Sequence, residues 1–331
     1  MATTYVIGAG ASLHAGYPLA STMGRGLFEF MLHCPVQPYP SAARLLIETF
    51  GQTSNIEDII TELGSRIQSL KDAGTIEDKA NPLSMGNLRG YLGIALREWF
   101  REIHTKPAGA YAEFADKLAQ PDDVIITFNY DDSLERELKR AGKWDISCGY
   151  GFPLAYHAHP SGVLMLKLHG SINWLVSVFG GTSGAFTWER SDASLGRHPV
   201  IHRADLEYLG YSDFSGHLYP GGGAFPCLIL PGRKKEFFYD TSFGYEFTEF
   251  WSARWSQATR AVQRSEKLVV CGYSLLAVDQ RACELLLKTP KKETHITIIS
   301  GDQNERIASD FRTAGFHSVQ VFPGGRFEDW I

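Results

Sequence analysis

The sequence lacks the features that mark membrane, secreted, disordered or repetitive proteins. No run approaches the 18 apolar residues that a membrane-spanning helix needs, and no basic segment precedes the apolar start Tyr5-Val6-Ile7 as it would in a signal peptide. Low-complexity stretches and internal repeats are also missing. We therefore expect a folded protein of the cytoplasm, whose 331 residues allow two domains or one domain with insertions.

Cysteine is scarce, and basic residues are not in excess. The five cysteines are Cys34, Cys148, Cys227, Cys271 and Cys283. Because no two of them form a C-x-x-C pair, the sequence argues against a disulfide framework and against a cysteine-rich zinc site. Lys and Arg number 32 against 37 Asp and Glu, a net charge of −5. Since phosphate contacts need a basic surface, we expect no direct nucleic-acid binding, and no metal.

Short apolar runs alternate with helical patterns along much of the chain. The runs expected as buried strands are 5–7, 124–128, 163–168, 227–230, 268–271, 296–299 and 319–322. Strands that alternate with helices are joined by right-handed crossovers and form a parallel sheet. The pattern therefore predicts an α/β fold, with a Rossmann-like parallel sheet that helices cover on both faces.

Two long segments interrupt this alternation. Residues 20–118 keep helical spacing with no strand between, and Asn55 is the expected N-cap of one of their helices. Residues 172–224 are rich in Gly, Ser, Tyr and His and show no clear period, so we expect loops with short strands. We expect one domain over 1–331, with a helical insertion at 20–118, a loop-rich insertion at 172–224 and a core of 1–19, 119–171 and 225–331.

Polar, glycine-containing segments follow five of the expected strands. They are Gly8-Ala9-Gly10-Ala11-Ser12, Thr127-Phe128-Asn129-Tyr130-Asp131, Lys167-Leu168-His169-Gly170, Cys271-Gly272-Tyr273-Ser274 with Asp279, and Ser300-Gly301-Asp302. Ligands of parallel sheets bind at the carboxyl ends of the strands, so these segments indicate one shared site. Each also has a structural interpretation: a tight turn for the first, a helix cap for Asn129, Asp279 or Asp302, and a core histidine for His169.

Four of these segments resemble the motifs of sirtuins, in the family's order. Gly8 to Ser12 with Gly16-Tyr17-Pro18 resembles the opening Gly-Ala-Gly-x-Ser and Gly-x-Pro motif, and Thr127 to Asp131 is similar to Thr-x-Asn-x-Asp. The run from Lys167 to Trp174 resembles the catalytic His-Gly segment of prokaryotic sirtuin-like proteins. Gly272-Tyr273-Ser274-Leu275 with Asp279 resembles their late Gly-Tyr-Ser motif.

The chain departs from deacylating sirtuins in two places. It has no four-cysteine zinc module, and Pro18 is followed by Leu19-Ala20-Ser21 where those enzymes continue with Asp-Phe-Arg. The missing module argues against a peptide-binding cleft and hence against protein deacylation. Zinc-free members with helical insertions resemble the NAD-consuming effectors of bacterial antiphage defence, and this is the branch that we expect.

The resemblance implies cleavage of the nicotinamide–ribose bond of NAD, with NAD as substrate. The backbone amides of Gly8, Ala9, Gly10 and Ala11 and the Ser12 hydroxyl would hold the pyrophosphate. The catalytic residues would be Asn129, which orients the ribose and the attacking water, Asp131, which meets the carboxamide, and His169, the general base. The phosphate and adenosine side would be lined by Gly272, Tyr273, Ser274, Asp279 and Asp302.

Other functions stay open at this point. The pocket could bind NAD or ADP-ribose as a regulator without turnover, or the chain could be a zinc-free NAD-dependent deacylase. A dehydrogenase is disfavoured because position 13 is Leu where the third glycine of G-x-G-x-x-G would stand. An NAD-consuming effector needs restraint, so we expect a homo-oligomer or a separate subunit such as a HerA-type ATPase or an Argonaute. The aromatic helix 243–255 is either an interface for this purpose or part of the core.

Overall fold

The computed structural model describes most of the chain. The described residues are 3–51, 55–75, 81–104, 108–146, 149–151, 162–177, 188–189, 200–202, 224–233, 248–276 and 279–331.

Six parallel strands form the main sheet, in the order β10-β9-β8-β1-β2-β3. They are β1 Thr3–Ile7, β2 Val124–Thr127, β3 Leu164–Lys167, β8 Lys267–Cys271, β9 His295–Ile299 and β10 Val319–Val321. Strand β1 lies between β8 and β2, so the strand order reverses beside it, and the five polar segments follow five adjacent strands. The structure confirms the predicted Rossmann-like parallel sheet.

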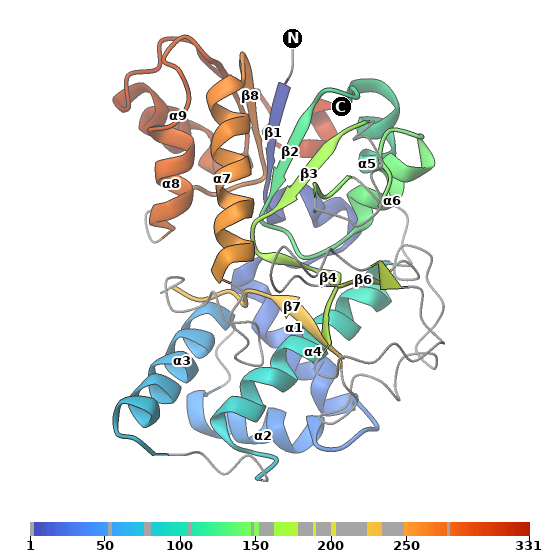
Figure 1. Ribbon diagram of the computed structural model, residues 1–331, viewed down its shortest axis with the longest axis vertical. Helices are drawn as coiled ribbons and strands as arrows, with labels where there is room; N and C mark the ends of the chain where they lie inside the picture. The colour runs from blue at the N-terminus through green and yellow to red at the C-terminus, as the bar shows by residue number, and fades with distance from the viewer. Residues whose placement is uncertain are drawn as a thin grey trace.

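Alternate residues of each strand enter two separate hydrophobic cores. In β1, Tyr5 and Ile7 belong to one core and Val6 to the other. The Val6 core is closed by α7 Thr248–Arg264, α8 Gln280–Leu287 and α9 Asn304–Thr313 (Figure 1). The Tyr5 core is closed by α5 Gly109–Glu113, the π-helical turn η2 Phe114–Leu118, α6 Ser133–Arg140 and α10 Phe327–Trp330. Burial on both faces explains why the strands are continuous apolar runs.

The expected helices of residues 20–118 are confirmed. They are α1 Ala20–His33, α2 Tyr39–Phe50, α3 Ile56–Asp72 and α4 Met85–His104, followed by α5 and η2. Asn55 caps α3, because its side chain accepts a hydrogen bond from the Glu57 N–H at 3.0 Å. Helices α1 to α4 form a layer beyond the carboxyl ends of the main sheet (Figure 1), and their apolar side chains join the Tyr5 core.

A second, antiparallel sheet corrects one expectation. Its order is β5-β6-β4-β7, from β4 Gly170–Ser177, β5 Trp188–Glu189, β6 Val200–His202 and β7 Ala224–Leu228. The run 227–230, expected in the core of the parallel fold, contributes instead to β7, which pairs with β4. A buried apolar run does not show which strand it will pair with. The chain turns out of the main sheet at Gly170, whose φ is +86° and where a Cβ would lie 2.0 Å from the Cys227 carbonyl oxygen.

The aromatic side chains of α7 belong to the core. Phe250, Trp251 and Trp255 are all buried, so the interface expected as one alternative is wrong for these three residues. Residues 243–247 of the expected helix lie outside the described residues. Along an amphipathic helix, an aromatic stripe that packs on a sheet and one that packs on a partner have the same spacing.

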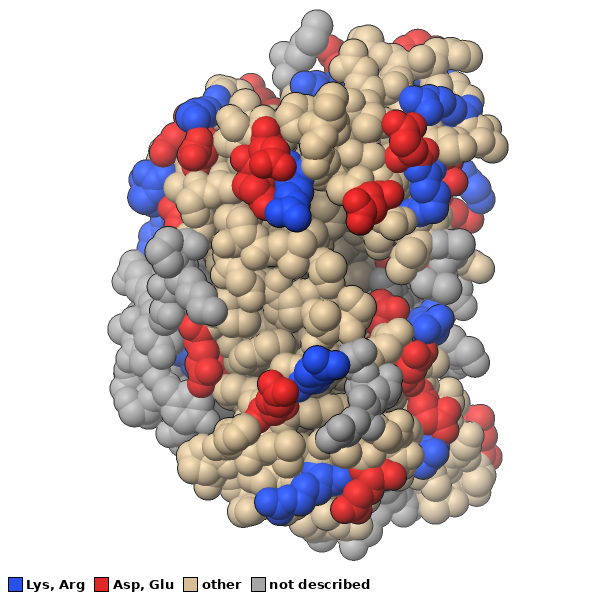
Figure 2. Space-filling model, turned by 180° about the vertical axis from the view of Figure 1, so that it is seen from behind, with Lys and Arg blue, Asp and Glu red and all other residues tan. Residues whose placement is uncertain are grey.

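On the face seen in Figure 2, positive and negative side chains of the described residues are not separated into different regions. Acidic and basic side chains are interspersed there around an uncharged middle, with no continuous basic patch on that face. In the part of the chain that the structure describes, no helix combines the length and the apolarity needed to cross a membrane.

Replacing Gly272 with alanine should destabilise the fold severely. Gly272 has a φ of +60°, and a Cβ there would lie 2.1 Å from the Ala11 backbone nitrogen, so backbone strain and a clash add together. We expect Gly272→Ala to lower the free energy of unfolding by about 3 kcal/mol or more in urea titrations. Gly301→Ala is the control, because Gly301 has a φ of +58° with open space around its Cβ position. Equal losses of stability in the two variants would contradict the close approach of Gly272 to Ala11.

Candidate functional site

The turns after β1 and β8 pack backbone against backbone. The Gly8 N–H donates to the Cys271 carbonyl at 2.9 Å, and the Gly10 N–H donates to the Gly272 carbonyl at 2.9 Å. A Cβ on Gly8 would lie 2.6 Å from the Gly272 carbonyl oxygen. The glycines of the Gly-Ala-Gly segment are therefore required by contact between two turns of the protein, whether or not a ligand approaches them.

This packing already uses most of the amides expected to hold a pyrophosphate. The Ala11 N–H donates to the Gly8 carbonyl at 3.0 Å, so three of the four amides assigned to the pyrophosphate are already bonded within the protein, those of Gly8, Gly10 and Ala11. The amide of Ala9 is not among the bonded ones. Ala9 is the first residue of η1 Ala9–Ala15, a 3₁₀ helix.

The Asn129 carboxamide is held in one orientation. Its Nδ2 group donates to the Gly8 carbonyl at 3.0 Å and to the Ser12 hydroxyl at 2.9 Å. Because a carbonyl oxygen accepts only from a donor, the NH₂ end must face Gly8, and both of its hydrogens are used. The Oδ1 oxygen has no partner among the described residues, so it is the end of Asn129 that remains available to a bound molecule.

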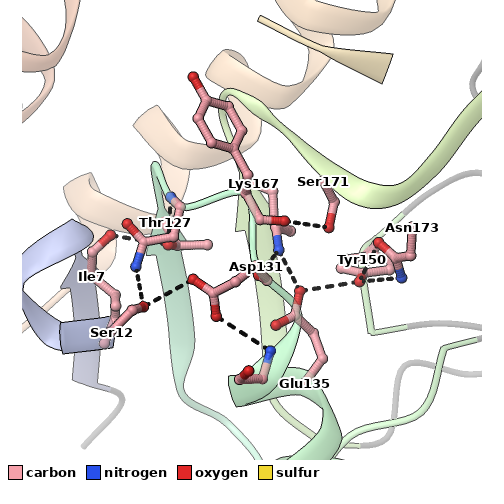
Figure 3. Close-up of polar contacts among 12 residues, drawn as sticks. Ile7, Ser12, Thr127, Asp131, Glu135, Tyr150, Lys167, Ser171 and Asn173 are labelled. Carbon is pink, nitrogen blue, oxygen red and sulfur yellow. Dashed lines mark hydrogen bonds and ion pairs between the residues drawn. The ribbon is translucent and has the colours of Figure 1, made fainter. Parts of the chain in front are cut away.

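The hydrogen-bonding capacity of the Ser12 hydroxyl is fully used. It donates to Asp131 Oδ2 at 2.9 Å (Figure 3), accepts from Asn129 Nδ2, and lies 2.7 Å from the Tyr111 hydroxyl, which must then be a donor. A hydroxyl has one hydrogen and two lone pairs, so no donor is left for a phosphate. In this arrangement the Ser12 hydroxyl supports Asn129 and Asp131, and its role toward a phosphate stays a prediction. Tyr111, in α5, is a supporting residue that the sequence analysis missed.

The Asp131 carboxylate lies inside the same network. Its Oδ2 accepts from Ser12, and its Oδ1 accepts from the Ser133 N–H at 3.3 Å. Burial raises the pKa of Asp131, while the nearby Lys167 ammonium opposes that rise. The helix α6 begins at Ser133, after residues 128–132, which form the loop that carries Asn129 and Asp131.

His169 lies against the residues on both sides of Asn129. Its ring centroid is 5.1 Å from that of Phe128 and 6.5 Å from that of Tyr130. Asn129 is 8% exposed and His169 is 7% exposed, so both are largely shielded from solvent. The carboxamide and the imidazole therefore belong to one region of the molecule, at the carboxyl ends of β2 and β3.

Aromatic stacking joins this region to the end of β8. The Phe128 ring stacks on Tyr273 with centroids 4.4 Å apart and planes 13° apart. The Tyr273 hydroxyl donates to Asp279 Oδ2 at 3.0 Å, and Asp279 Oδ1 accepts from the Ala282 N–H at 3.4 Å as the N-cap of α8. Asp279 thus has the structural role that the sequence left open for it, and its role toward a ligand stays a prediction.

The remaining predicted residues lie at the edge of this region. The carbonyl oxygens of Ser274 and Leu275 accept hydrogen bonds from the Arg306 guanidinium, which comes from α9. Asp302 is exposed in η7 Gly301–Gln303 at the end of β9, two strands from β1. The structure does not place Asp302 in contact with Asn129, His169 or Ser12. Within the described residues, no group of three or more His, Cys, Asp and Glu side chains is arranged to hold a metal ion.

Comparison with known proteins gives a weak structural likeness and nothing closer. No family model matches the chain, and no curated protein matches it. Similar solved structures include a Sir2 homologue in complex with NAD, with 14% identity over 99% of this chain and 85% of that chain and a TM-score of 0.44. A mutant Sir2 homologue in complex with ADP-ribose has 13% identity over 95% and 88%, with a TM-score of 0.40. A structure on sirtuin substrate affinity has 15% identity over 90% and 82%, with a TM-score of 0.40.

Removing the Ser12 hydroxyl should cost stability. Ser12→Ala leaves a buried Asn129 N–H without an acceptor and Asp131 Oδ2 without its donor, so we expect the free energy of unfolding to fall by about 2–3 kcal/mol. Ser300→Ala is the matched control, because the Ser300 hydroxyl is also buried at a strand end but has no partner among the described residues. Urea titration of both variants checks this. If Ser12→Ala is as stable as Ser300→Ala, Ser12 does not hold the network.

Proposed function

We propose that the chain binds NAD at the carboxyl ends of β1, β2, β3 and β8 and hydrolyses its nicotinamide–ribose bond. Water and NAD would give nicotinamide, a proton and ADP-ribose, or a cyclised form if a hydroxyl of the nucleotide replaces the water. The observation that carries the proposal is the locked Asn129 carboxamide, whose unpartnered Oδ1 belongs to the same region as the His169 ring.

The residues suit a reaction in which the leaving group is already good. Nicotinamide leaves as a neutral molecule, and the ribose carbon gains oxocarbenium character in the transition state, so positioning and electrostatics matter more than a strong nucleophile. An amide oxygen such as Asn129 Oδ1 can accept a hydrogen bond from the attacking water or from a ribose hydroxyl and so fix its direction. His169 is the candidate general base, because an imidazole can take the proton that the water loses.

The Asn129 carboxamide is oriented before NAD binds, so it does not have to turn during the reaction. Both hydrogens of Asn129 Nδ2 are bonded to acceptors that are themselves held in place. Gly8 is held by its hydrogen bond to β8, and Ser12 is held by its hydrogen bond to Asp131. A dipole that is fixed before the substrate binds stabilises a transition state more than one that must turn. Of the four amides expected to meet the pyrophosphate, that of Ala9 is the candidate donor, because the other three are bonded within the protein.

Substituting Asn129 or His169 should abolish the loss of NAD. We expect Asn129→Ala and His169→Ala each to lower kcat by about 100-fold or more, the scale on which a positioned dipole or a general base acts. Free nicotinamide and the nucleotide product are separated by chromatography. His295→Ala, at the opposite end of the sheet, is the control and should keep full turnover. Undiminished turnover in either site variant would remove that residue from the mechanism.

The same incubation decides between the functions that the sequence leaves open. NAD that binds but stays intact would identify a regulatory binding module. Release of acetyl-ADP-ribose from an acetylated peptide would identify a zinc-free deacylase. Nicotinamide released without any peptide supports the hydrolase.

We further propose that this hydrolase is an effector of bacterial antiviral defence, restrained by self-assembly or by a separate subunit. The resemblance of the sequence to zinc-free members with helical insertions supports this role. Light scattering of the isolated protein, combined with the NAD assay, tests the restraint. A strictly monomeric protein with full activity would contradict it.

A further inference from the structure

A buried lysine lies beneath the loop that carries Asn129. Lys167, the last residue of β3, is fully buried, and its ammonium group donates to the Asp131 carbonyl at 2.5 Å and to Glu135 Oε1 at 2.7 Å (Figure 3). An ammonium group costs much free energy to bury unless it is paired and hydrogen-bonded. The fold therefore uses a costly group to hold one backbone carbonyl of the 128–132 loop.

Glu135 continues the contacts away from the loop. Its Oε1 also accepts from the Tyr150 hydroxyl at 3.1 Å, and that hydroxyl accepts from Asn173 Nδ2 at 3.0 Å. Asn173 lies on β4, three residues beyond Gly170. Burial raises the pKa of Glu135, and the Lys167 ammonium opposes that rise. Lys167 and Glu135 thus connect α6, β3 and β4 through side chains that solvent does not reach.

The sequence positions make this connection significant for the site. Lys167 stands two residues before His169, and Asp131 stands two residues after Asn129. The bond from Lys167 to the Asp131 carbonyl therefore ties the end of β3, which His169 follows, to the loop that presents the carboxamide. A neighbouring bond, from the Ile172 N–H to the Tyr130 carbonyl at 2.9 Å, links the same loop to β4 without a charge.

Stability alone does not explain a buried ion pair. Replacing such a pair with uncharged side chains of similar volume is often neutral or stabilising, whereas removing one partner leaves an uncompensated charge. We propose that Lys167 and Glu135 are positioning residues that hold the 128–132 loop, and with it Asn129 Oδ1, in place relative to His169. The catalytic part of this inference depends on the proposed NAD hydrolysis, and the structural part does not.

The test is the neutral double variant Lys167→Met with Glu135→Gln. Both replacements match the size of the native side chain, and the introduced carboxamide keeps an oxygen that can accept from the Tyr150 hydroxyl, so the fold should persist. Hydrogen–deuterium exchange followed by mass spectrometry measures the order of the loop. We expect peptides that cover 128–135 to exchange about tenfold faster, while peptides of β9 and α9 stay unchanged.

Kinetics give a second readout. We expect kcat for NAD hydrolysis to fall about tenfold or more with KM changed less than about threefold, because misplaced catalytic groups affect the transition state more than ground-state binding. The control is Thr4→Val with Ser265→Ala, which removes another buried polar pair, located at the amino ends of β1 and β8. It should lower stability and leave both kcat and loop exchange unchanged.

The outcomes are separable. Unchanged exchange over 128–135 in the double variant overturns the inference, and so does faster exchange spread over the whole sheet, which would mean that the pair only stabilises the fold. Equal kcat in the double variant and the wild type overturns the catalytic part. If the wild-type protein leaves NAD intact, the proposed function fails, and the exchange measurement still decides the positioning role.

Discussion

The site depends on one side-chain interaction, the pair of hydrogen bonds that Asn129 Nδ2 makes to the Gly8 carbonyl and the Ser12 hydroxyl. These two bonds join the turn after β2 to the turn after β1. They also decide which end of the carboxamide a bound molecule can meet. Because Ser12 has one hydrogen to give and gives it to Asp131, the Tyr111 hydroxyl must donate to Ser12.

Residues that resemble a ligand-binding motif here serve the fold first. Gly8 and Gly10 are required by the close approach of Gly272, and their amides are bonded to the turn after β8. Asp279 caps α8, and Ser12 is saturated by its neighbours. A motif of this kind can fix the shape of a site without touching the ligand at each of its positions. Contact with a ligand has to be argued atom by atom, from the groups that remain available.

The sequence predicted the parts of the structure that depend on local pattern. Apolar runs such as 124–128 and 268–271 were recognisable as strands because both faces of the sheet are buried, and their polar ends necessarily meet at one edge. The cap at Asn55 follows from local chemistry as well. These signals are sufficient to predict from the sequence that Asn129 and His169 lie in one region.

Contacts between distant segments could not be predicted in the same way. Nothing in the run 227–230 distinguishes a parallel from an antiparallel partner, so β7 was assigned to the wrong sheet. Tyr111 is separated from Ser12 by 99 residues, and no spacing relates the two. A lysine at the end of a strand normally reaches solvent. The burial of Lys167 is therefore recognised only in the structure, where Glu135 lies beside it.

The helical segment 20–118 contributes to the site rather than merely interrupting the chain. Tyr111 of α5 reaches Ser12, and the buried Arg97 of α4 donates from Nε to the Ile172 carbonyl at 2.7 Å, on the strand that follows His169. The apolar side chains of α1 to α4 share a continuous core with one face of the sheet. Because packed cores resist gradual deformation, a shift of these helices would be transmitted to β4 and to the Ser12 network together. The division into a core and an insertion therefore describes only the order of segments along the sequence. The residues that support Asn129 and His169 come from both parts.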